Sequence, residues 1–538
     1  MAGPSISISG WIGGLVLAVA AVLAPCVCAA EVSLTSACAG LTSMSGASLH
    51  VDSAVWIDAG PIAEPTGSTA GPFPGHCRVR GETAEHTDAR GRHFGVRFEL
   101  RLPQIWNGRF FFQGGGGLDG SVQPAVGVVN GGPPALARGF AVLSMDGGHE
   151  GQDASFASDQ QARLDFAYQA IGKAEVAAKR LIQAYYGRPI AKSYFVGCSN
   201  GGREAMIAAQ RYPLDFDGVV AGAPGFRLSR AAIQEAWANA HYASLAPVDA
   251  RGQPDLTRGI TEADLQLVVA AVKEDCDALD GLKDGLISNP AACHFSPRRL
   301  ACSAARGAPC LSPAKVAVLE AVFGGAKDSA GHALYSRFFW DTGIDQSGWR
   351  VWTLGLAGAS PALNVILGGP ALSDYFMTPA EPSRSPFSLD FDTAVEAVSQ
   401  TGAINDATST LLNSFAGHGG KLLIYHGVSD PVFSAADTAA WYDALRAQDA
   451  QAPSYARLFL VPGMNHCSGG IAADRFDTLS AIVDWVEKGQ APDALIATGT
   501  ALPGVSRPLC AYPAYARYRG GPADSAPSFS CVVDQASK

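Results

Sequence analysis

Short hydrophobic runs typical of buried strands recur in two parts of the chain, with a helical pattern between them. In the first half they are RFFFQ (109–113), FAVLSM (140–145) and KSYFVG (192–197), and near the end KLLIYHG (421–427) and ARLFLVPG (456–463). The segment GGREAMIAAQRY (201–212) has helical composition, and its alanines would allow close packing against a sheet. This pattern predicts an α/β fold.

The pattern of strands and helices stops near residue 225 and resumes near residue 419. Between these points lie Gly- and Pro-rich stretches such as SPRRLACSAARGAPCLSP (296–313), which form no regular strand–helix repeat. We therefore expect a first core segment (31–225), an insertion (226–418) and a second core segment (419–538).

The first thirty residues differ from the rest, because no charged side chain precedes Glu31. The apolar run WIGGLVLAVAAVLA (11–24) is followed by the small residues Cys28, Ala29 and Ala30. This arrangement predicts a cleaved signal peptide over 1–30 and a secreted or periplasmic protein, although the segment lacks the usual Lys or Arg. An uncleaved membrane anchor is the alternative.

Composition excludes some classes of function. The 538 residues are 48% hydrophobic, the formal net charge is −10, and no block of like charges occurs. We therefore expect a globular protein that binds no nucleic acid and has no stable association with membranes.

A nucleophile motif lies between the strand 192–197 and the helix 201–212. Residues 197–201 read Gly-Cys-Ser-Asn-Gly, which fits the G-x-S-x-G elbow of α/β-hydrolases. In that fold the serine stands on a sharp strand-to-helix turn, and the strand–turn–helix context here supports it. The sequence thus predicts an α/β-hydrolase fold with Ser199 as the nucleophile.

A serine nucleophile needs a base and a group that orients the base, and this fold orders them Ser, Asp or Glu, His. Asp430 follows the strand 421–427, and His466 follows the strand 456–463. We predict that His466 accepts the proton of Ser199 and that Asp430 orients His466. An Asp-Pro turn is the alternative for Asp430, and His426 reads as a core histidine.

Cysteine usage fits an exported protein. Without Cys26 and Cys28 ten cysteines remain, which in an oxidising compartment suggests five disulfides. Four pairs are close in sequence: Cys38–Cys77, Cys276–Cys293, Cys302–Cys310 and Cys510–Cys531. Cys198 and Cys467 remain, and because they adjoin Ser199 and His466, a hydrogen-bonded serine and histidine would bring them within bridging distance. A buried free thiol at Cys198 is the alternative.

The glycine-rich segment after the strand 109–113 can be interpreted in two ways. Gly115, Gly117 and Gly120 fit the dinucleotide motif G-x-G-x-x-G, but no good helix follows and no acidic residue is clearly placed. With an elbow present, we favour an oxyanion loop. The backbone N–H of Asn200 and that of Gly115 or Gly116 would then bind the developing negative charge.

An acidic loop lies inside the insertion. Asp277, Asp280 and Asp284 occur within eight residues, beside Gly281 and Gly285. Clustered carboxylates of this kind suit a hard cation such as Ca²⁺. A solvated acidic turn is the alternative, and the absence of histidines argues against a catalytic transition metal.

The chain resembles the tannase and feruloyl esterase family through the motifs GCSNGGRE (197–204) and GMNHC (463–467). The resemblance extends from about Cys38 to Cys531 and implies a disulfide between Cys198 and Cys467. It also implies a structural Ca²⁺ held by the carboxylates of Asp277, Asp280 and Asp284 and the carbonyls of Leu282 and Leu286. Finally, it implies that the insertion is a lid whose aromatic side chains enclose the acyl group. The candidates are Trp349, Trp352, Tyr375, Phe376 and Phe387.

The resemblance implies a secreted serine esterase acting on a small aromatic ester or a feruloylated polysaccharide. Family members that hydrolyse terephthalate monoesters carry a lid arginine for the free carboxylate, whereas this chain has no Lys or Arg between Arg350 and Arg384, and Ile366 falls near that position. We therefore expect feruloyl esters as substrates. Galloyl esters (a tannase), terephthalate monoesters and an inactive binding protein on a hydrolase scaffold are the alternatives.

Overall fold

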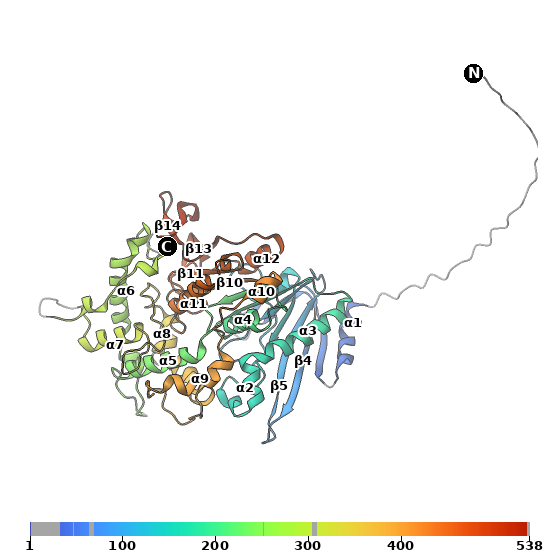
Figure 1. Ribbon diagram of the computed structural model, residues 1–538, viewed down its shortest axis with the longest axis horizontal. Coiled ribbons are helices and arrows are strands. Elements are labelled where there is room, and N and C mark those ends of the chain that lie inside the picture. The colour runs from blue at the N-terminus through green and yellow to red at the C-terminus, as the bar shows by residue number, and fades with distance from the viewer. Residues whose placement is uncertain (2–32, 47, 64–68, 251, 304–308, 535–538) are drawn as a thin grey trace, which may run out of the picture. The chain divides into compact units, whose positions relative to one another are not determined.

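Nine strands form one sheet in the order β1–β4–β5–β7–β6–β8–β9–β10–β11 in the computed structural model (Figure 1). Strands β7, β6, β8, β9, β10 and β11 run parallel, while β1, β4 and β5 extend the sheet in antiparallel pairing. The strands are β1 (Leu49–Ile57), β4 (His76–Thr87), β5 (His93–Pro103), β6 (Arg109–Gln113), β7 (Ala141–Met145), β8 (Lys192–Cys198), β9 (Gly218–Gly222), β10 (Lys421–Gly427) and β11 (Ala456–Val461). This arrangement confirms the predicted α/β-hydrolase fold.

The structure describes Met1 and residues 33–46, 48–63, 69–250, 252–303 and 309–534. The predicted signal peptide therefore lies, apart from Met1, outside the described residues. Leu34–Lys538 forms one compact unit. None of the helices in the described ranges is both long and apolar enough to cross a membrane.

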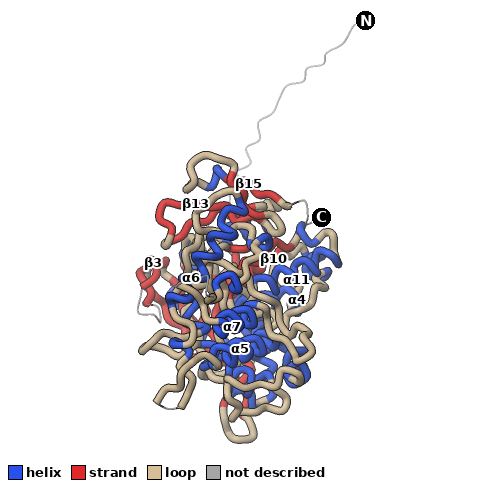
Figure 2. The backbone as a smooth tube through the Cα atoms, turned by 90° about the vertical axis from the view of Figure 1, so that its left-hand side faces the viewer, coloured by secondary structure: helices blue, strands red, loops and turns tan. Residues whose placement is uncertain are grey.

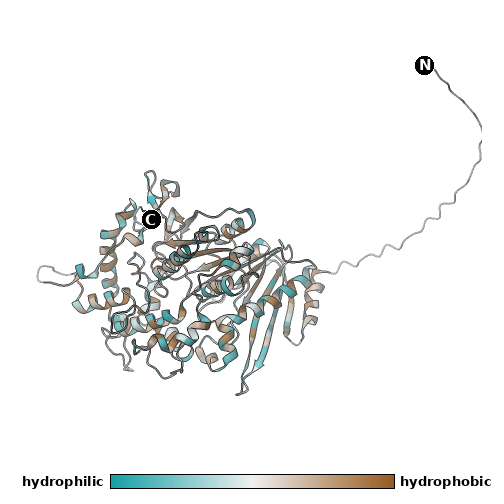
Figure 3. Cartoon of the chain, in the orientation of Figure 1, coloured by the Kyte–Doolittle hydropathy of each residue, from teal (hydrophilic) through white to brown (hydrophobic). Residues whose placement is uncertain are grey.

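The central strands are buried on both faces, which explains their continuous hydrophobic runs. In β6, Phe110, Phe111 and Phe112 are fully buried. By contrast, exposed and buried residues are interspersed along β4, and Figure 3 shows hydrophilic and hydrophobic residues mixed in β4 and β5. The interspersed pattern thus belongs to β4 near the antiparallel edge, whereas β5, next to the parallel strands, is almost continuously buried.

Helices cover both faces of the sheet. Helices α3 (Ala170–Tyr186), α4 (Asn200–Arg211) and α11 (Ala435–Gln448) contribute to the hydrophobic core on one face. Helix α12 (Thr478–Lys488) packs on the other, where Leu479, Ile482 and Trp485 are almost completely buried. Each such large apolar side chain contributes about 1.5–3 kcal/mol when fully buried.

The described residues of the predicted insertion (226–418) contribute no strand to the nine-stranded sheet. They form the helices α5 (Leu228–Ala243), α6 (Glu262–Cys276), α7 (Pro313–Phe323), α8 (Ser347–Thr353) and α9 (Ala394–Asn405). Figure 2 shows α5, α6 and α7 on the side that faces its viewer. A separate hydrophobic cluster joins α5, α6 and α7 through residues such as Leu265, Leu319 and Phe323. The domain boundaries and the function of this segment as a lid stay predictions.

The remaining elements are short. Helices α1 (Leu34–Gly40), α2 (Gln160–Leu164) and α10 (Asn413–His418) accompany three two-stranded sheets. These sheets pair β2 (Gly60–Ala63) with β3 (Thr69–Phe73), β12 (Ala494–Gly499) with β13 (Leu502–Cys510), and β14 (Tyr515–Tyr518) with β15 (Phe529–Val532).

Five disulfides join the ten cysteines considered above. The structure has Cys38–Cys77, Cys276–Cys293, Cys302–Cys310, Cys510–Cys531 and Cys198–Cys467. Four link positions no more than 39 residues apart, whereas Cys198 and Cys467 are separated by 269 residues. That last bridge connects the two core segments on either side of the insertion.

Candidate active site

Ser199 occupies the turn between β8 and α4 with a left-handed backbone conformation, φ 65°. A non-glycine residue rarely adopts such a φ, and the cost is about 1–3 kcal/mol. The flanking glycines make the turn possible. A Cβ atom at Gly197 would overlap the carbonyl of Gly201, and a Cβ atom at Gly201 would overlap the carbonyl of Gly115. The G-x-S-x-G spacing is therefore a packing requirement of this elbow.

The structure brings Ser199, His466 and Asp430 into one chain of hydrogen bonds. Ser199 Oγ lies 2.8 Å from His466 Nε2, and His466 Nδ1 lies 2.8 Å from Asp430 Oδ2. Asp430 follows β10 and His466 follows β11, at the same edge of the parallel sheet as the end of β8. With Nδ1–H donating to Asp430, Nε2 is free to accept the proton of Ser199.

Asp430 is completely buried, yet it remains in its charged form. Burial alone would raise the pKa of the Asp430 carboxyl group, but attraction to His466 and hydrogen bonds from His426 and His466 hold it well below its usual range. The backbone N–H groups of Val432 and Phe433 also donate to Asp430 Oδ1. The carboxylate can therefore stabilise positive charge on His466.

His426 is a core residue in the structure. It is fully buried, and its ring nitrogens lie 2.9 Å from Thr438 Oγ1 and 3.0 Å from the carbonyl oxygen of Phe433. Its Nε2 atom also lies 3.3 Å from Asp430 Oδ2. His426 therefore lies beside the same carboxylate oxygen of Asp430 that His466 contacts, and its hydrogen-bond partners are Thr438 and Phe433, not Ser199.

The disulfide Cys198–Cys467 joins the residue before Ser199 to the residue after His466. Its Cα atoms are 6.0 Å apart. Cys467 has a left-handed φ of 63°, and its carbonyl oxygen accepts a hydrogen bond from the Asn130 side chain at 2.9 Å. The covalent link thus connects the two loops that carry the hydrogen-bonded serine and histidine.

Buried acidic groups contact the glycine loop that follows β6. The N–H of Gly115 donates to Glu204 Oε2 at 2.9 Å, so this group is already occupied. Asn200 lies at the first position of α4, and Gly117 and Asn200 line the cavity beside Ser199. Of the two predicted oxyanion glycines, Gly116 therefore remains the candidate, and Gly117 joins it as a residue that the sequence analysis missed.

Asp119 and Glu204 form a pair of buried carboxyl groups beneath this loop. Burial, the charge of Glu204 and a hydrogen bond with Glu204 all raise the pKa of Asp119 well above its usual range. Two carboxyl groups can share a hydrogen bond only when one of them is protonated. Asp119 also accepts a hydrogen bond from the Asn200 side chain, whose carbonyl accepts one from Arg203. The pair therefore fixes both the glycine loop and Asn200.

A cavity of about 60 Å³ lies beside Ser199. Its lining is mainly apolar and includes Leu228, Ala232, Trp352, Leu367, Phe376 and Phe433. The rings of Trp352 and Phe433 also contact His466 edge-on, with centroids 5.2 and 5.4 Å away. Of the five predicted aromatic candidates, only Trp352 and Phe376 line this cavity, whereas Trp349, Tyr375 and Phe387 pack in hydrophobic clusters.

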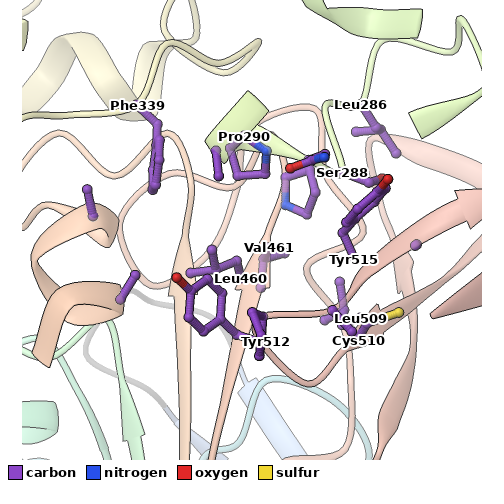
Figure 4. Close-up of a pocket in the computed structure, with 18 of the residues that line it drawn as sticks. Leu286, Ser288, Pro290, Phe339, Leu460, Val461, Leu509, Cys510, Tyr512 and Tyr515 are labelled. Carbon is purple, nitrogen blue, oxygen red and sulfur yellow. The ribbon is translucent and has the colours of Figure 1, made fainter. Parts of the chain in front are cut away.

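A second cavity, of about 370 Å³, lies between the loop after α6, β11 and the C-terminal strands (Figure 4). Its lining includes Leu286, Pro290, Phe339, Leu460, Tyr512 and Tyr515. Among the described residues that line it, none belongs to the hydrogen-bonded group around Ser199. The reaction chemistry therefore concerns the smaller cavity.

The acidic loop after α6 contains carboxylate oxygens that could bind a cation, but they are not grouped around a common point. The Asp277 carboxylate accepts from the N–H of Gly285, Asp280 from those of Leu282 and Ser288, and Asp284 from that of Leu286 and from Arg507. Burial and the charge of Asp284 raise the pKa of Asp280 to about 6, despite its backbone hydrogen bonds. The donor chemistry suits Ca²⁺, but within the described ranges no three His, Cys, Asp or Glu side chains are grouped as metal ligands.

Comparisons with known proteins agree on one family. Residues 77–532 match the family described as tannase and feruloyl esterase. The chain is 40% identical to a mono(2-hydroxyethyl) terephthalate hydrolase of Piscinibacter sakaiensis, over 90% of this chain and 88% of that protein. It is 30% identical to a probable feruloyl esterase of Arthroderma benhamiae, over 81% of this chain and 82% of that protein. Among solved structures, feruloyl esterase B from Aspergillus oryzae aligns with a TM-score of 0.79 at 26% identity, over 93% of this chain and 100% of that one.

Proposed function

The chain belongs to the tannase and feruloyl esterase family, and from that premise we propose that it is an exported serine carboxylesterase that hydrolyses esters of aromatic carboxylic acids. The observation that carries this proposal is the continuous hydrogen-bonded chain from Ser199 through His466 to Asp430. The five disulfides support an oxidising compartment outside the cytoplasm.

The proposed reaction begins when Ser199 Oγ attacks the ester carbonyl carbon and its proton passes to His466 Nε2. The carbonyl oxygen becomes an oxyanion, which the N–H of Asn200 and an N–H of the glycine loop stabilise. One such donor typically contributes about 10²–10³-fold to kcat. Asp430 keeps His466 in the required tautomer and offsets its positive charge.

The tetrahedral intermediate then collapses, the carbon–oxygen bond to the alcohol breaks, and His466 returns its proton to the leaving alkoxide. This step leaves the acyl group esterified to Ser199. Water next attacks the acyl carbonyl while His466 accepts a proton, and the acid is released as Ser199 recovers its hydrogen. An inactive binding protein is disfavoured, because such a protein needs neither the 2.8 Å serine–histidine contact nor the disulfide beside it.

Within the esters of aromatic carboxylic acids, two narrower classes of substrate have support. The relative at 40% identity favours terephthalate monoesters over the feruloyl esters expected from the sequence. The cavity favours uncharged acyl groups such as feruloyl or galloyl, because its described lining contains no Lys or Arg to bind a second carboxylate. The structural likeness to feruloyl esterase B supports the same class.

The test is a side-by-side assay of methyl ferulate, methyl caffeate, methyl gallate and mono(2-hydroxyethyl) terephthalate with the purified protein. We expect hydrolysis of at least one ester and its loss by several orders of magnitude in Ser199→Ala. Ser399→Ala, which changes an exposed serine on α9, is the matched control and should retain full activity. Normal turnover by Ser199→Ala would overturn the proposed mechanism.

A further inference from the structure

Glu235 is a buried acid in the cavity that contains Ser199. It lies on α5 with 8% of its surface exposed, and it lines this cavity together with Gly368. A Cβ atom at Gly368 would overlap Glu235 Oε2, so the glycine leaves room for the carboxyl group at the cavity wall. The Glu235 carboxyl group therefore lies against Gly368, beside the space open to an acyl group.

The Glu235 carboxyl group has no hydrogen-bond or ion-pair partner among the described residues. A buried polar group without a partner destabilises the fold, so such groups are normally paired. Apart from Ser199 and Asn200, its neighbours in the cavity are apolar or aromatic, including Leu228, Leu367 and Phe376. A polar atom of a bound ligand would supply the missing partner.

The charge of Glu235 follows from this apolar setting. Burial raises the pKa of the Glu235 carboxyl group to about 8. At neutral pH the group is therefore mainly protonated, and it can both donate and accept a hydrogen bond. A hydroxyl group matches these two capacities, whereas a second carboxylate would bring negative charge into a cavity without a lining cation.

We propose that Glu235 is a specificity residue that hydrogen-bonds a hydroxyl group on the aromatic acyl part of the ester bound at Ser199. This inference rests on the proposed function, because it concerns the substrate of that same site. It selects acyl rings that carry a hydroxyl group over rings that carry a carboxylate. Glu235 does not take part in bond breaking, and its effect is on kcat/KM ratios between esters.

The test compares three methyl esters that differ only in the para substituent: methyl 4-hydroxybenzoate, methyl benzoate and monomethyl terephthalate. In Glu235→Leu, the ratio of kcat/KM for the hydroxy ester to that for methyl benzoate should fall about tenfold, the effect of one lost hydrogen bond. Glu235→Gln keeps a donor and an acceptor, so it should retain most of this ratio. Its amide cannot ionise, whereas Glu235 becomes mainly charged above about pH 8. From pH 7 to pH 9 the kcat/KM ratio of monomethyl terephthalate to methyl benzoate should therefore fall in the wild type but not in Glu235→Gln.

Glu175→Gln is the matched control, because Glu175 is a buried acid on α3 that pairs with Lys179 away from the cavity. It should leave every ratio unchanged. An unchanged hydroxy-ester ratio in Glu235→Leu, with hydrolysis still dependent on Ser199, would overturn this inference alone. If the wild type hydrolyses none of these three esters and none of the earlier panel, or if Ser199→Ala remains active, the proposed function is wrong and the inference fails with it. If the wild type hydrolyses esters of the earlier panel but not methyl 4-hydroxybenzoate, the inference alone is wrong.

Melting curves show whether each variant folds. If Glu235→Leu does not fold, Glu235→Gln carries the test, since its change is close to isosteric. The monomethyl terephthalate ratio must then fall with rising pH in the wild type and stay constant in Glu235→Gln, and equal pH profiles of the two proteins overturn the inference.

Discussion

Two buried aspartates near Ser199 illustrate how the same burial has opposite results. Asp430 faces His466 and His426, so its pKa is lowered and it stays charged. Asp119 faces Glu204, so burial and the neighbouring acid raise its pKa. The first charge orients the histidine, and the shared proton of the second pair holds the loop next to Asn200. Burial favours the protonated form of both aspartates, and the partner of each decides whether its pKa ends below or above its usual range.

Asp119→Asn should make the protein less sensitive to high pH. Because the folded state raises the pKa of Asp119, folding binds a proton there, and the free energy of unfolding falls as pH rises from about 4 through the raised value. Asparagine cannot ionise and still accepts from Asn200. The melting temperature of the variant relative to the wild type should therefore increase from pH 5 to pH 9.

Asp524→Asn, at an exposed position, is the control for this comparison and should show no such trend. A constant difference between Asp119→Asn and the wild type over this pH range would mean that Asp119 and Glu204 share no proton.

Asp430→Asn should lower kcat by about 10⁴-fold while the fold remains intact. The amide would donate to His466 Nδ1, so the proton would move to Nε2, which could then no longer accept from Ser199. Steady-state kinetics with the best ester of the panel and a melting curve check both parts. A decrease of less than tenfold would show that Asp430 does not control the tautomer of His466.

At the scale of elements, the disulfide Cys198–Cys467 fixes two loops that follow β8 and β11. A misplacement near 1 Å at such a site can cost on the order of a hundredfold in rate. Cys198→Ala/Cys467→Ala should therefore remain folded but lose most of its kcat, with a smaller change in KM. Cys510→Ala/Cys531→Ala removes a bridge between β13 and β15 and should lower the melting temperature with little effect on kcat.

Equal loss of activity in the two double variants would contradict a local effect on the loops. If both double variants fail to fold, the local effect is also contradicted, because both disulfides would then act only by stabilising the fold. Peptide mapping without reduction checks the pairing itself, since one fragment must link residues around Ser199 to residues around His466.

The elements that carry Ser199, Asp430 and His466 were predictable because each follows a short buried strand with a clear hydrophobic pattern. Parallel strands bring their carboxyl ends to one edge, so chain order alone suggested how the three would meet. The antiparallel strands β1, β4 and β5 were not specified, because their pairing depends on contacts between distant segments. Strand order was not readable for the same reason.

The cavity lining shows where prediction from sequence stops. Trp349 and Trp352 lie three residues apart on α8, yet Trp349 is in a hydrophobic cluster and only Trp352 lines the cavity. Glu235 reads as an ordinary polar residue of a helix, since its burial depends on the segment around Gly368 folding over it. A sequence pattern predicts which face of a helix is apolar, but it does not predict which segment of the chain covers that face.

At the scale of the whole molecule, the acidic loop after α6 connects the insertion to the C-terminal part of the chain. Arg507 of β13 pairs with Asp284, and Asn289 donates to Asp534 at 2.9 Å. The disulfide Cys276–Cys293 closes the same loop. Changes in this loop should therefore affect the stability of the molecule more than its chemistry.

We predict that Ca²⁺ binds this loop and raises the melting temperature by several degrees. An ion that binds only the folded state stabilises by about 2.7 kcal/mol at one hundred times its dissociation constant. Asp277 and Asp280 are buried carboxylates that form no ion pair in the described part of the chain, although Lys273 attracts Asp277 at longer range, so a cation would relieve their repulsion from Asp284. EDTA should lower the melting temperature, and re-added Ca²⁺ should restore it.

In Asp280→Asn this response of the melting temperature to Ca²⁺ should be largely lost, whereas Asp524→Asn should respond like the wild type. Since the loop is separate from the Ser199 cavity, kcat well below the melting temperature should change little. If neither EDTA nor Asp280→Asn moves the melting temperature, the loop is a hydrogen-bonded acidic turn, and its contact with Arg507 is sufficient to hold the C-terminal strands.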